Sequence, residues 1–240
     1  MKDTHHGIYL LPNLFTTASL FSAFYSIVSS LKGHYEAAVV AIFIGMIADG
    51  LDGRIARLTN TQTAFGAQYD SLSDMVTFGV APALLLYSWT LHSMGKIGWL
   101  VSFMFTAAVA LRLARFNIHV EDQDKRFFQG LSSPTSAAVV TSFAWMCHQN
   151  ELNNGFVMIL TAVITALMAI LMISNIRYYS FKDLDFKGKV PFLYLVIMVI
   201  IFMAIAANPA VVLFLGFSAY ALSGPVHTLW HWYDNEHDDA

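Results

Sequence analysis

The sequence predicts an all-α integral membrane protein with about eight transmembrane helices. Three observations lead to this prediction: the composition, the lengths of the apolar runs and the placement of basic residues. Hydrophobic residues make up 57% of the 240 residues and charged residues only 12%, with a mean hydropathy of +0.57. A soluble domain carries about 25% charged residues, so much of this surface must face lipid. The formal net charge of −3 argues against a nucleic-acid partner, which requires a basic face.

Eight segments come near the length of about 20 apolar residues that a transmembrane helix needs. They are residues 12–31, 36–57, 70–91, 97–117, 134–149, 155–174, 190–207 and 209–228. The fifth is the shortest and contains several hydroxyl side chains, and the Asn208-Pro209 pair separates the last two. No polar stretch is long enough for a separate soluble domain, so residues 1–240 are expected to form a single transmembrane domain.

The basic residues test this division independently. With a cytoplasmic N-terminus, only Lys32 and Lys96 fall on the outer side. The inner side receives Lys2, Arg54, Arg57, Arg112, Arg115, Lys125, Arg126, Arg177, Lys182, Lys187 and Lys189. Such asymmetry is typical of membrane proteins, which keep basic residues on the cytoplasmic side. We therefore expect a multi-pass protein of the cell (inner) membrane with both termini in the cytoplasm.

Four aspartates lie in or beside segments predicted to be membrane helices: Asp49, Asp52, Asp70 and Asp74. A charged residue at a helix centre costs about 2.5–3.5 kcal/mol on insertion scales, so these side chains need an interface, a wet cavity or cations. Each pair, spaced i, i+3 or i, i+4, shares one helical face. The first pair ends the second span, the second pair opens the third, and residues 58–69 form the predicted loop between them. Four carboxylates are therefore expected to converge on the cytoplasmic side.

Carboxylate oxygens favour Mg²⁺ or Mn²⁺ over zinc or copper, and four acids suit two-metal phosphoryl transfer. Gly50, Gly53, Ala56 and Gly66 leave room for close backbone approach. Paired acids also occur in proton relays and ion-coupling sites, and small residues are common in plain helix packing. An ion-coupled transporter, however, places its sites between two repeat halves near the membrane centre, whereas these acids lie in one hairpin. A non-catalytic scaffold would need no such pattern.

The acids stand in a fixed frame, D-x2-D-G-x2-A-R-x8-G-x3-D-x3-D, over residues 49–74. The matching positions are Asp49, Asp52, Gly53, Ala56, Arg57, Gly66, Asp70 and Asp74. This frame resembles the signature of the CDP-alcohol phosphatidyltransferase family. The resemblance implies that family's helical bundle, a CDP-activated lipid substrate from the bilayer, two divalent metal ions (Mg²⁺ or Mn²⁺) and a homodimer.

The resemblance also implies roles for individual residues. Asp49, Asp52 and Asp70 would hold the metals, and Asp74 would bind metal and act as the base toward the acceptor hydroxyl. Gly53, Ala56, Arg57 and Gly66 would shape the CDP-lipid site. At the start of the first span, Asn13 and Thr16 allow two readings, ordinary helix capping or contact with the nucleotide and its phosphates, and both remain open.

Two stretches bear on the acceptor: L-A-R-F-N (113–117) and G-L-S-S-P (130–134). They resemble the phosphatidylserine synthase branch of the family, which implies transfer from CDP-diacylglycerol to L-serine. The candidate serine contacts are Arg112, Arg115, Asn117 and Ser133. Arginine can clamp a carboxylate through two hydrogen bonds, but glycerol 3-phosphate would also favour arginine, and basic residues are expected on this side in any case. Phosphatidylglycerophosphate synthase and phosphatidylcholine synthase therefore remain alternatives.

Overall fold

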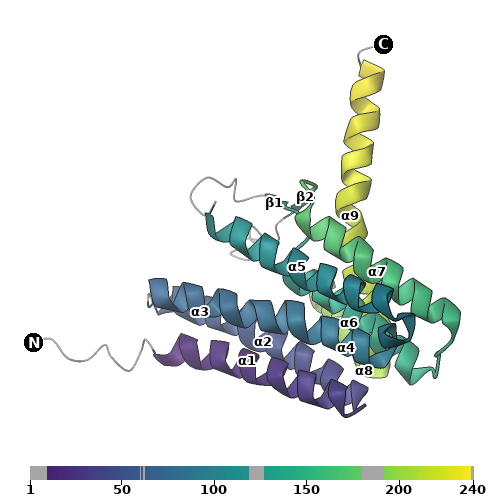
Figure 1. Ribbon diagram of the computed structural model, residues 1–240. Coiled ribbons are helices and arrows are strands. Elements are labelled where there is room, and N and C mark those ends of the chain that lie inside the picture. The colour runs from purple at the N-terminus through teal and green to yellow at the C-terminus, as the bar shows by residue number, and fades with distance from the viewer. Residues whose placement is uncertain (1–9, 60, 62, 119–126, 180–191, 239–240) are drawn as a thin grey trace, which may run out of the picture.

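The computed structural model describes residues 10–59, 61, 63–118, 127–179 and 192–238, which are mostly helical. The helices are α1 (Leu10–Leu31), α2 (Tyr35–Leu58), α3 (Ala64–Asp74), α4 (Ala81–Trp89), α5 (Lys96–Ile118), α6 (Ser133–Gln149), α7 (Gly155–Ile173), α8 (Phe192–Ala207) and α9 (Pro209–Asp238) (Figure 1). A π-helical segment, η1 (Met75–Val80), joins α3 and α4 into one continuous helix, and a 3₁₀ turn, η2 (Leu91–Met94), precedes α5. With that joined helix counted once, the described residues form eight long helical segments, and the predicted all-α fold is confirmed.

Five of these segments are long and apolar enough to cross a membrane, and the protein is therefore multi-pass. They are Pro12–Leu31, Ala64–Trp89, Lys96–Ile118, Gly155–Ile173 and Pro209–Thr228. Within α8, Leu193–Ala207 is apolar but shorter. The predicted spans 36–57 and 134–149 are also helical, as α2 and α6, although α2 carries two aspartates and α6 has only 17 residues.

Helix α6 is polar because it lies inside the protein. Thirteen of its 17 residues are buried, and it packs against α2, α4, α7 and α9. The Ser142 hydroxyl donates to the Ala138 carbonyl at 2.6 Å, so this hydroxyl is satisfied within the helix itself. A helix that faces protein on most sides can carry small polar residues, which favour close helix packing in membranes.

The connection between α2 and α3 differs from the prediction. We expected a loop over 58–69, but α3 begins at Ala64. The side chain of Thr63 accepts a hydrogen bond from the Gly66 amide at 2.9 Å and so caps the helix. Asp74 consequently lies well inside a continuous helix and does not open one.

Around η1, three other helices approach closely. The hydroxyls of Ser19 on α1 and Thr77 on η1 lie 3.1 Å apart. A Cβ atom on Gly45 of α2 would lie 3.0 Å from the Thr77 methyl, and one on Gly79 would lie 3.3 Å from Val109 of α5. Glycine therefore allows α2 and α5 to pack directly against the segment that follows Asp74.

A short antiparallel sheet, absent from the prediction, connects two loops. Strand β1 (Phe127–Gln129) pairs with β2 (Arg177–Tyr179). The next residue, Gly130, has a φ of +74°, and a Cβ atom there would come within 2.4 Å of the Met172 carbonyl oxygen. Glycine is thus required at this turn, which sets the start of α6 beside the ends of α5 and α7.

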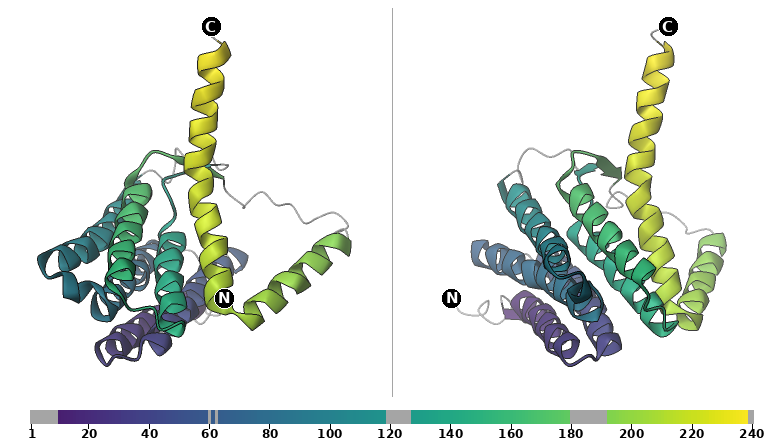
Figure 2. Two further views of the ribbon diagram at one scale, coloured as in Figure 1. Left: turned by 90° about the vertical axis from the view of Figure 1, so that its right-hand side faces the viewer. Right: turned by 45° about the vertical axis from the view of Figure 1, so that its right-hand side comes forward.

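The last two helices leave the bundle in different directions. Figure 2 shows α8 diverging from the other helices and α9 extending past them. Within the bundle α9 packs against α6, and the Tyr178 hydroxyl on β2 donates to the Ala221 carbonyl of α9 at 3.0 Å. Burial, followed by the neighbouring Tyr220, raises the pKa of Tyr178 to about 12, so this phenol remains a donor at neutral pH.

Candidate active site

The four aspartates of the signature come together between α2 and α3. One carboxylate oxygen from each of Asp49, Asp70 and Asp74 lies within 4.8 Å of the other two. The fourth carboxylate, Asp52, interacts electrostatically with Asp49 and Asp70. The helical spacing thus produced the predicted convergence, even though the predicted loop was too long.

Two oxygens in this cluster lack hydrogen-bond donors. Asp70 Oδ1 and Asp74 Oδ1 are buried, and neither accepts a hydrogen bond within the described part of the chain. A buried, unsatisfied carboxylate oxygen is costly, and a cation is the partner that would satisfy several of them at once. The donor set, all hard oxygen, fits a divalent metal such as Mg²⁺ or Mn²⁺.

Asp52 is held from the neighbouring helix. The Thr16 hydroxyl on α1 donates to Asp52 Oδ2 at 2.7 Å, and both side chains are buried, at 3% and 5% exposure. The Ser73 hydroxyl donates to the Thr16 carbonyl at 3.2 Å. Thr16 therefore links α1 to the acidic cluster on α2 and to α3, which is more than a capping role.

A cavity of about 210 Å³ adjoins the cluster between α1, α2 and α3. Its lining is Pro12, Asn13, Thr16, Asp52, Gly53, Ala56, Arg57, Thr61, Thr63, Gly66, Ala67 and Asp70. All six residues predicted from the sequence to contact the CDP-lipid are among them. A Cβ atom on Gly66 would lie 3.1 Å from the Thr63 hydroxyl and 3.4 Å from Asn13 Oδ1, so glycine keeps this wall of the cavity open.

Arg112 of α5 faces Asp74, the aspartate at the C-terminal end of α3, which is not part of the cavity lining. The guanidinium interacts electrostatically with Asp74 and donates from Nη1 to the Ser133 hydroxyl at 3.4 Å. Its Nε is buried and makes no hydrogen bond among the described residues. Arg112 and Ser133, both predicted to contact the acceptor, therefore lie together beside the acidic cluster.

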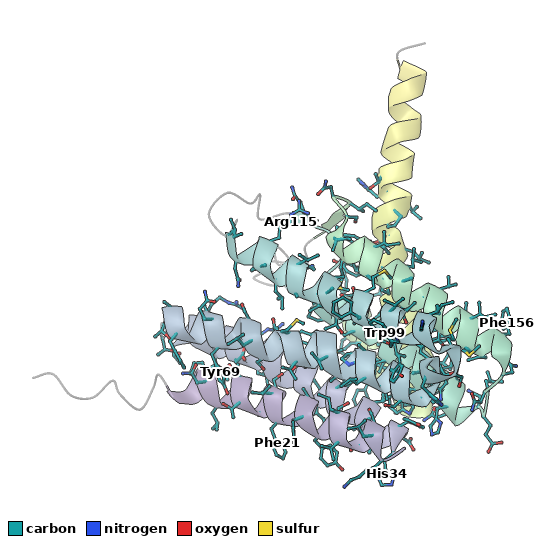
Figure 3. All side chains as sticks on the ribbon, viewed as in Figure 1. Phe21, His34, Tyr69, Trp99, Arg115 and Phe156 are labelled. Atoms are coloured by element: carbon teal, nitrogen blue, oxygen red, sulfur yellow. The ribbon has the colours of Figure 1, made fainter. Side chains whose placement is uncertain are left out.

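The other two predicted acceptor contacts have different surroundings. Arg115, on the side of α5 near the sheet (Figure 3), donates from Nη2 to Gln129 at 2.6 Å and to Asn175 at 2.8 Å. The Asn117 amide donates to the Ser71 hydroxyl at 3.0 Å. These bonds join α5 to the loops and to α3, and a serine-binding role for Arg115 and Asn117 stays a prediction.

The part of the chain that matches a known protein family contains the residues of this site. Residues 9–173 match the model of a family described as CDP-alcohol phosphatidyltransferase. The chain belongs to this family. The match includes the acidic cluster, the cavity, Arg112 and Ser133, whereas α8 and α9 lie beyond it.

Relatives with curated names are similar over much of their length. The chain is 38% identical over 195 residues to a CDP-diacylglycerol--serine O-phosphatidyltransferase of Helicobacter pylori (strain ATCC 700392 / 26695), covering 81% of this chain and 82% of the relative. It is 36% identical over 170 residues to an archaetidylserine synthase of Methanothermobacter thermautotrophicus, covering 70% of this chain and 69% of the relative. It is 38% identical over 159 residues to a CDP-diacylglycerol--serine O-phosphatidyltransferase of Saccharomyces cerevisiae, covering 60% of this chain and 55% of the relative.

Sequence reasoning missed several residues of the site. Thr61, Thr63 and Ala67 line the cavity but were assigned to the loop; a threonine three residues before Gly66 was the available capping signal. Tyr220 of α9 interacts electrostatically with Arg112, and no motif in the last span pointed to it.

Proposed function

We propose that this member of the CDP-alcohol phosphatidyltransferase family transfers the phosphatidyl group of CDP-diacylglycerol to L-serine and releases CMP. The observation that carries the proposal is that one acidic cluster adjoins both the cavity, through Asp52 and Asp70, and the buried Arg112, through Asp74. The relatives' names support the acceptor: two kinds of name differ in the lipid but share serine as the head group.

The cavity between α1, α2 and α3 is the proposed CDP site. Asn13, Thr16, Gly53, Ala56, Arg57 and Gly66 form the part of its lining assigned to the CDP-lipid. Arg57, at the end of α2, supplies positive charge for the diphosphate. Small residues let a nucleotide approach the backbone closely. The polar end of the lipid would thus rest beside Asp52 and Asp70.

Asp49, Asp52, Asp70 and Asp74 are the proposed ligands of two divalent ions, Mg²⁺ or Mn²⁺. When bound, such ions neutralise the diphosphate and the charge that develops as CMP departs. The residues of the chain supply the rest of the site: Thr16 orients Asp52, and the neighbouring helices keep the four carboxylates in contact.

Asp74 is the proposed general base. Its buried Oδ1 accepts no hydrogen bond among the described residues and so can receive the proton of the serine hydroxyl. The serine oxygen forms a bond to the phosphatidyl phosphorus, the bond from that phosphorus to the CMP oxygen breaks, and CMP leaves as an anion. Arg112, which faces Asp74, offers Nε and the guanidinium amines to the serine carboxylate, with Ser133 fixing its position.

We also propose that the site opens to the cytoplasm, that both termini are cytoplasmic and that the membrane is the inner one. Arg54, Arg57, Arg112 and Arg115 all lie on the helical turns near the site, as the positive-inside rule requires, whereas Lys32 and Lys96 belong to turns at the other helix ends. The resemblance to the family carries a further proposal, that two copies form a homodimer, which mass measurement of the detergent-solubilised protein tests.

An acceptor panel tests the activity. Purified protein with Mn²⁺ and CDP-diacylglycerol is given L-serine, glycerol 3-phosphate or choline, and CMP is measured. We expect CMP only with L-serine, together with phosphatidylserine in the lipid extract. CMP release that requires glycerol 3-phosphate or choline and ignores serine would refute the serine assignment, while an absence of CMP with all three would refute the reaction class.

A further inference from the structure

Tyr220 belongs to α9, outside the residues matched to the family, yet it reaches the same polar centre. Its phenol interacts electrostatically with Arg112, and Arg112 interacts in turn with Asp74. Arg112 therefore interacts both with a residue of α9 and with the proposed base.

Packing holds Tyr220 in this position. The ring centroids of Tyr220 and Tyr178 lie 5.8 Å apart. The Tyr178 hydroxyl also donates to the carbonyl of Ala221, the residue that follows Tyr220, at 3.0 Å. A Cβ atom on Gly224 would come within 2.5 Å of the Tyr178 ring, so α9 and β2 are in close contact here. Contacts between β2 and α9 therefore hold Tyr220 in this position.

The other side of Tyr220 borders a largely apolar cavity of about 590 Å³ between α6, α8 and α9. Tyr220 and Thr135 are the members of its lining that carry a hydroxyl group. Thr135 follows Ser133 by two residues in the first turn of α6, and Ser133 is the residue bonded to Arg112. The polar part of the lining therefore adjoins the side of the site assigned to the acceptor.

Arg112 has more donors than its described partners use. Its Nε is buried and makes no hydrogen bond to the residues that the structure describes, and its contact with Ser133, at 3.4 Å, is long for a hydrogen bond. A carboxylate accepts several hydrogen bonds at once, and a phenol hydroxyl can donate one of them beside a guanidinium.

We propose that Tyr220 determines acceptor specificity: its hydroxyl and the Arg112 guanidinium together bind the α-carboxylate of the amino-acid acceptor. This inference rests on the proposed serine transfer. It assigns recognition of the acceptor partly to α9, a helix beyond the family match, while the acidic cluster and the CDP cavity stay within it.

Tyr220→Phe tests the inference, because it removes the hydroxyl and keeps the ring. With L-serine, Mn²⁺ and CDP-diacylglycerol, we expect the KM for serine to rise about tenfold, the effect of losing one hydrogen bond to a charged group. The KM for CDP-diacylglycerol and kcat should stay within about twofold, since no contact to the acids or the cavity of the CDP site is lost. Melting in detergent checks that the variant is folded.

Two matched controls separate recognition from packing. Tyr194→Phe makes the same change on the exposed face of α8 and should leave every constant unchanged. Tyr178→Phe removes the bond to Ala221 and disturbs the packing of α9. Because Tyr178 helps to hold Tyr220 in place, Tyr178→Phe should lower the melting temperature in detergent, which Tyr220→Phe should not. An unchanged serine KM in Tyr220→Phe, or a melting temperature lowered as far as in Tyr178→Phe, would overturn the role of Tyr220. A wild-type protein without serine-dependent CMP release would instead refute the proposed function.

Discussion

Replacing Thr16 by valine should test whether α1 takes part in catalysis. The hydroxyl donates to Asp52 Oδ2 at 2.7 Å, and both residues are almost completely buried. Valine has nearly the same shape, so the change removes the donor with little effect on packing. A hydrogen bond to a charged group contributes about 1.5–3 kcal/mol.

If Asp52 must be oriented for the reaction, the loss corresponds to a decrease in kcat/KM of about 10- to 150-fold. The assay is CMP release at limiting and saturating Mn²⁺, and we expect the larger loss at limiting metal. Thr17→Val is the matched control: this neighbouring hydroxyl is exposed and bonds to Asn13 and Tyr69, and its loss should change kcat/KM by less than threefold. Activity of Thr16→Val within twofold of wild type at both metal concentrations would refute the reasoning.

Four further outcomes are expected. Asp74→Asn should retain CDP-diacylglycerol binding but lose about 10²- to 10⁴-fold in kcat, the usual contribution of a general base; normal turnover would remove Asp74 from that role. Arg112→Lys should raise the serine KM at least about tenfold, since lysine lacks the planar fork, and an unchanged KM would place the serine carboxylate elsewhere. Gly98→Ala should lower the free energy of unfolding by more than about 3 kcal/mol, because its Cβ would lie 1.8 Å from the Leu91 carbonyl oxygen, whereas Gly216→Ala, with nothing within 4 Å, should melt normally in detergent. A chelator should abolish CMP release and added Mn²⁺ or Mg²⁺ should restore it; activity that survives chelation would argue against a metal site.

Local sequence patterns were sufficient for the helices and for the meeting of the aspartates. Apolar runs of span length give the helical segments, because the bilayer sets the length of a helix that crosses it. Spacings of three and four residues put Asp49 with Asp52, and Asp70 with Asp74, on single faces. The helices that carry the two pairs are antiparallel neighbours, so these faces meet whether the connection has the five residues observed or the twelve predicted.

Features that depend on tertiary contacts were not predictable in this way. By contrast, the start of helix α3 at Ala64 had a local signal, the cap Thr63, and our prediction of a loop over 58–69 missed it. The sheet of β1 and β2 has three residues in each strand, too few for a periodic pattern. Tyr220 resembles any aromatic residue of a membrane helix until its neighbours on α5 are known.

The π-helical segment after Asp74 changes the angle between the side chains that precede it and those that follow it in one continuous helix. An α-helix turns about 100° per residue, and a π segment accommodates extra chain within a continuous helix. Residues before η1 carry Asp70 and Asp74, which meet Asp49 of α2, while Thr77 and Gly79 within η1 pack against α1, α2 and α5. Deleting one residue in η1 would rotate the two halves relative to each other, so that either the acids or the packing surface, but not both, could keep its place. The number of residues in this short segment is thus as much a part of the active site as the identity of the aspartates.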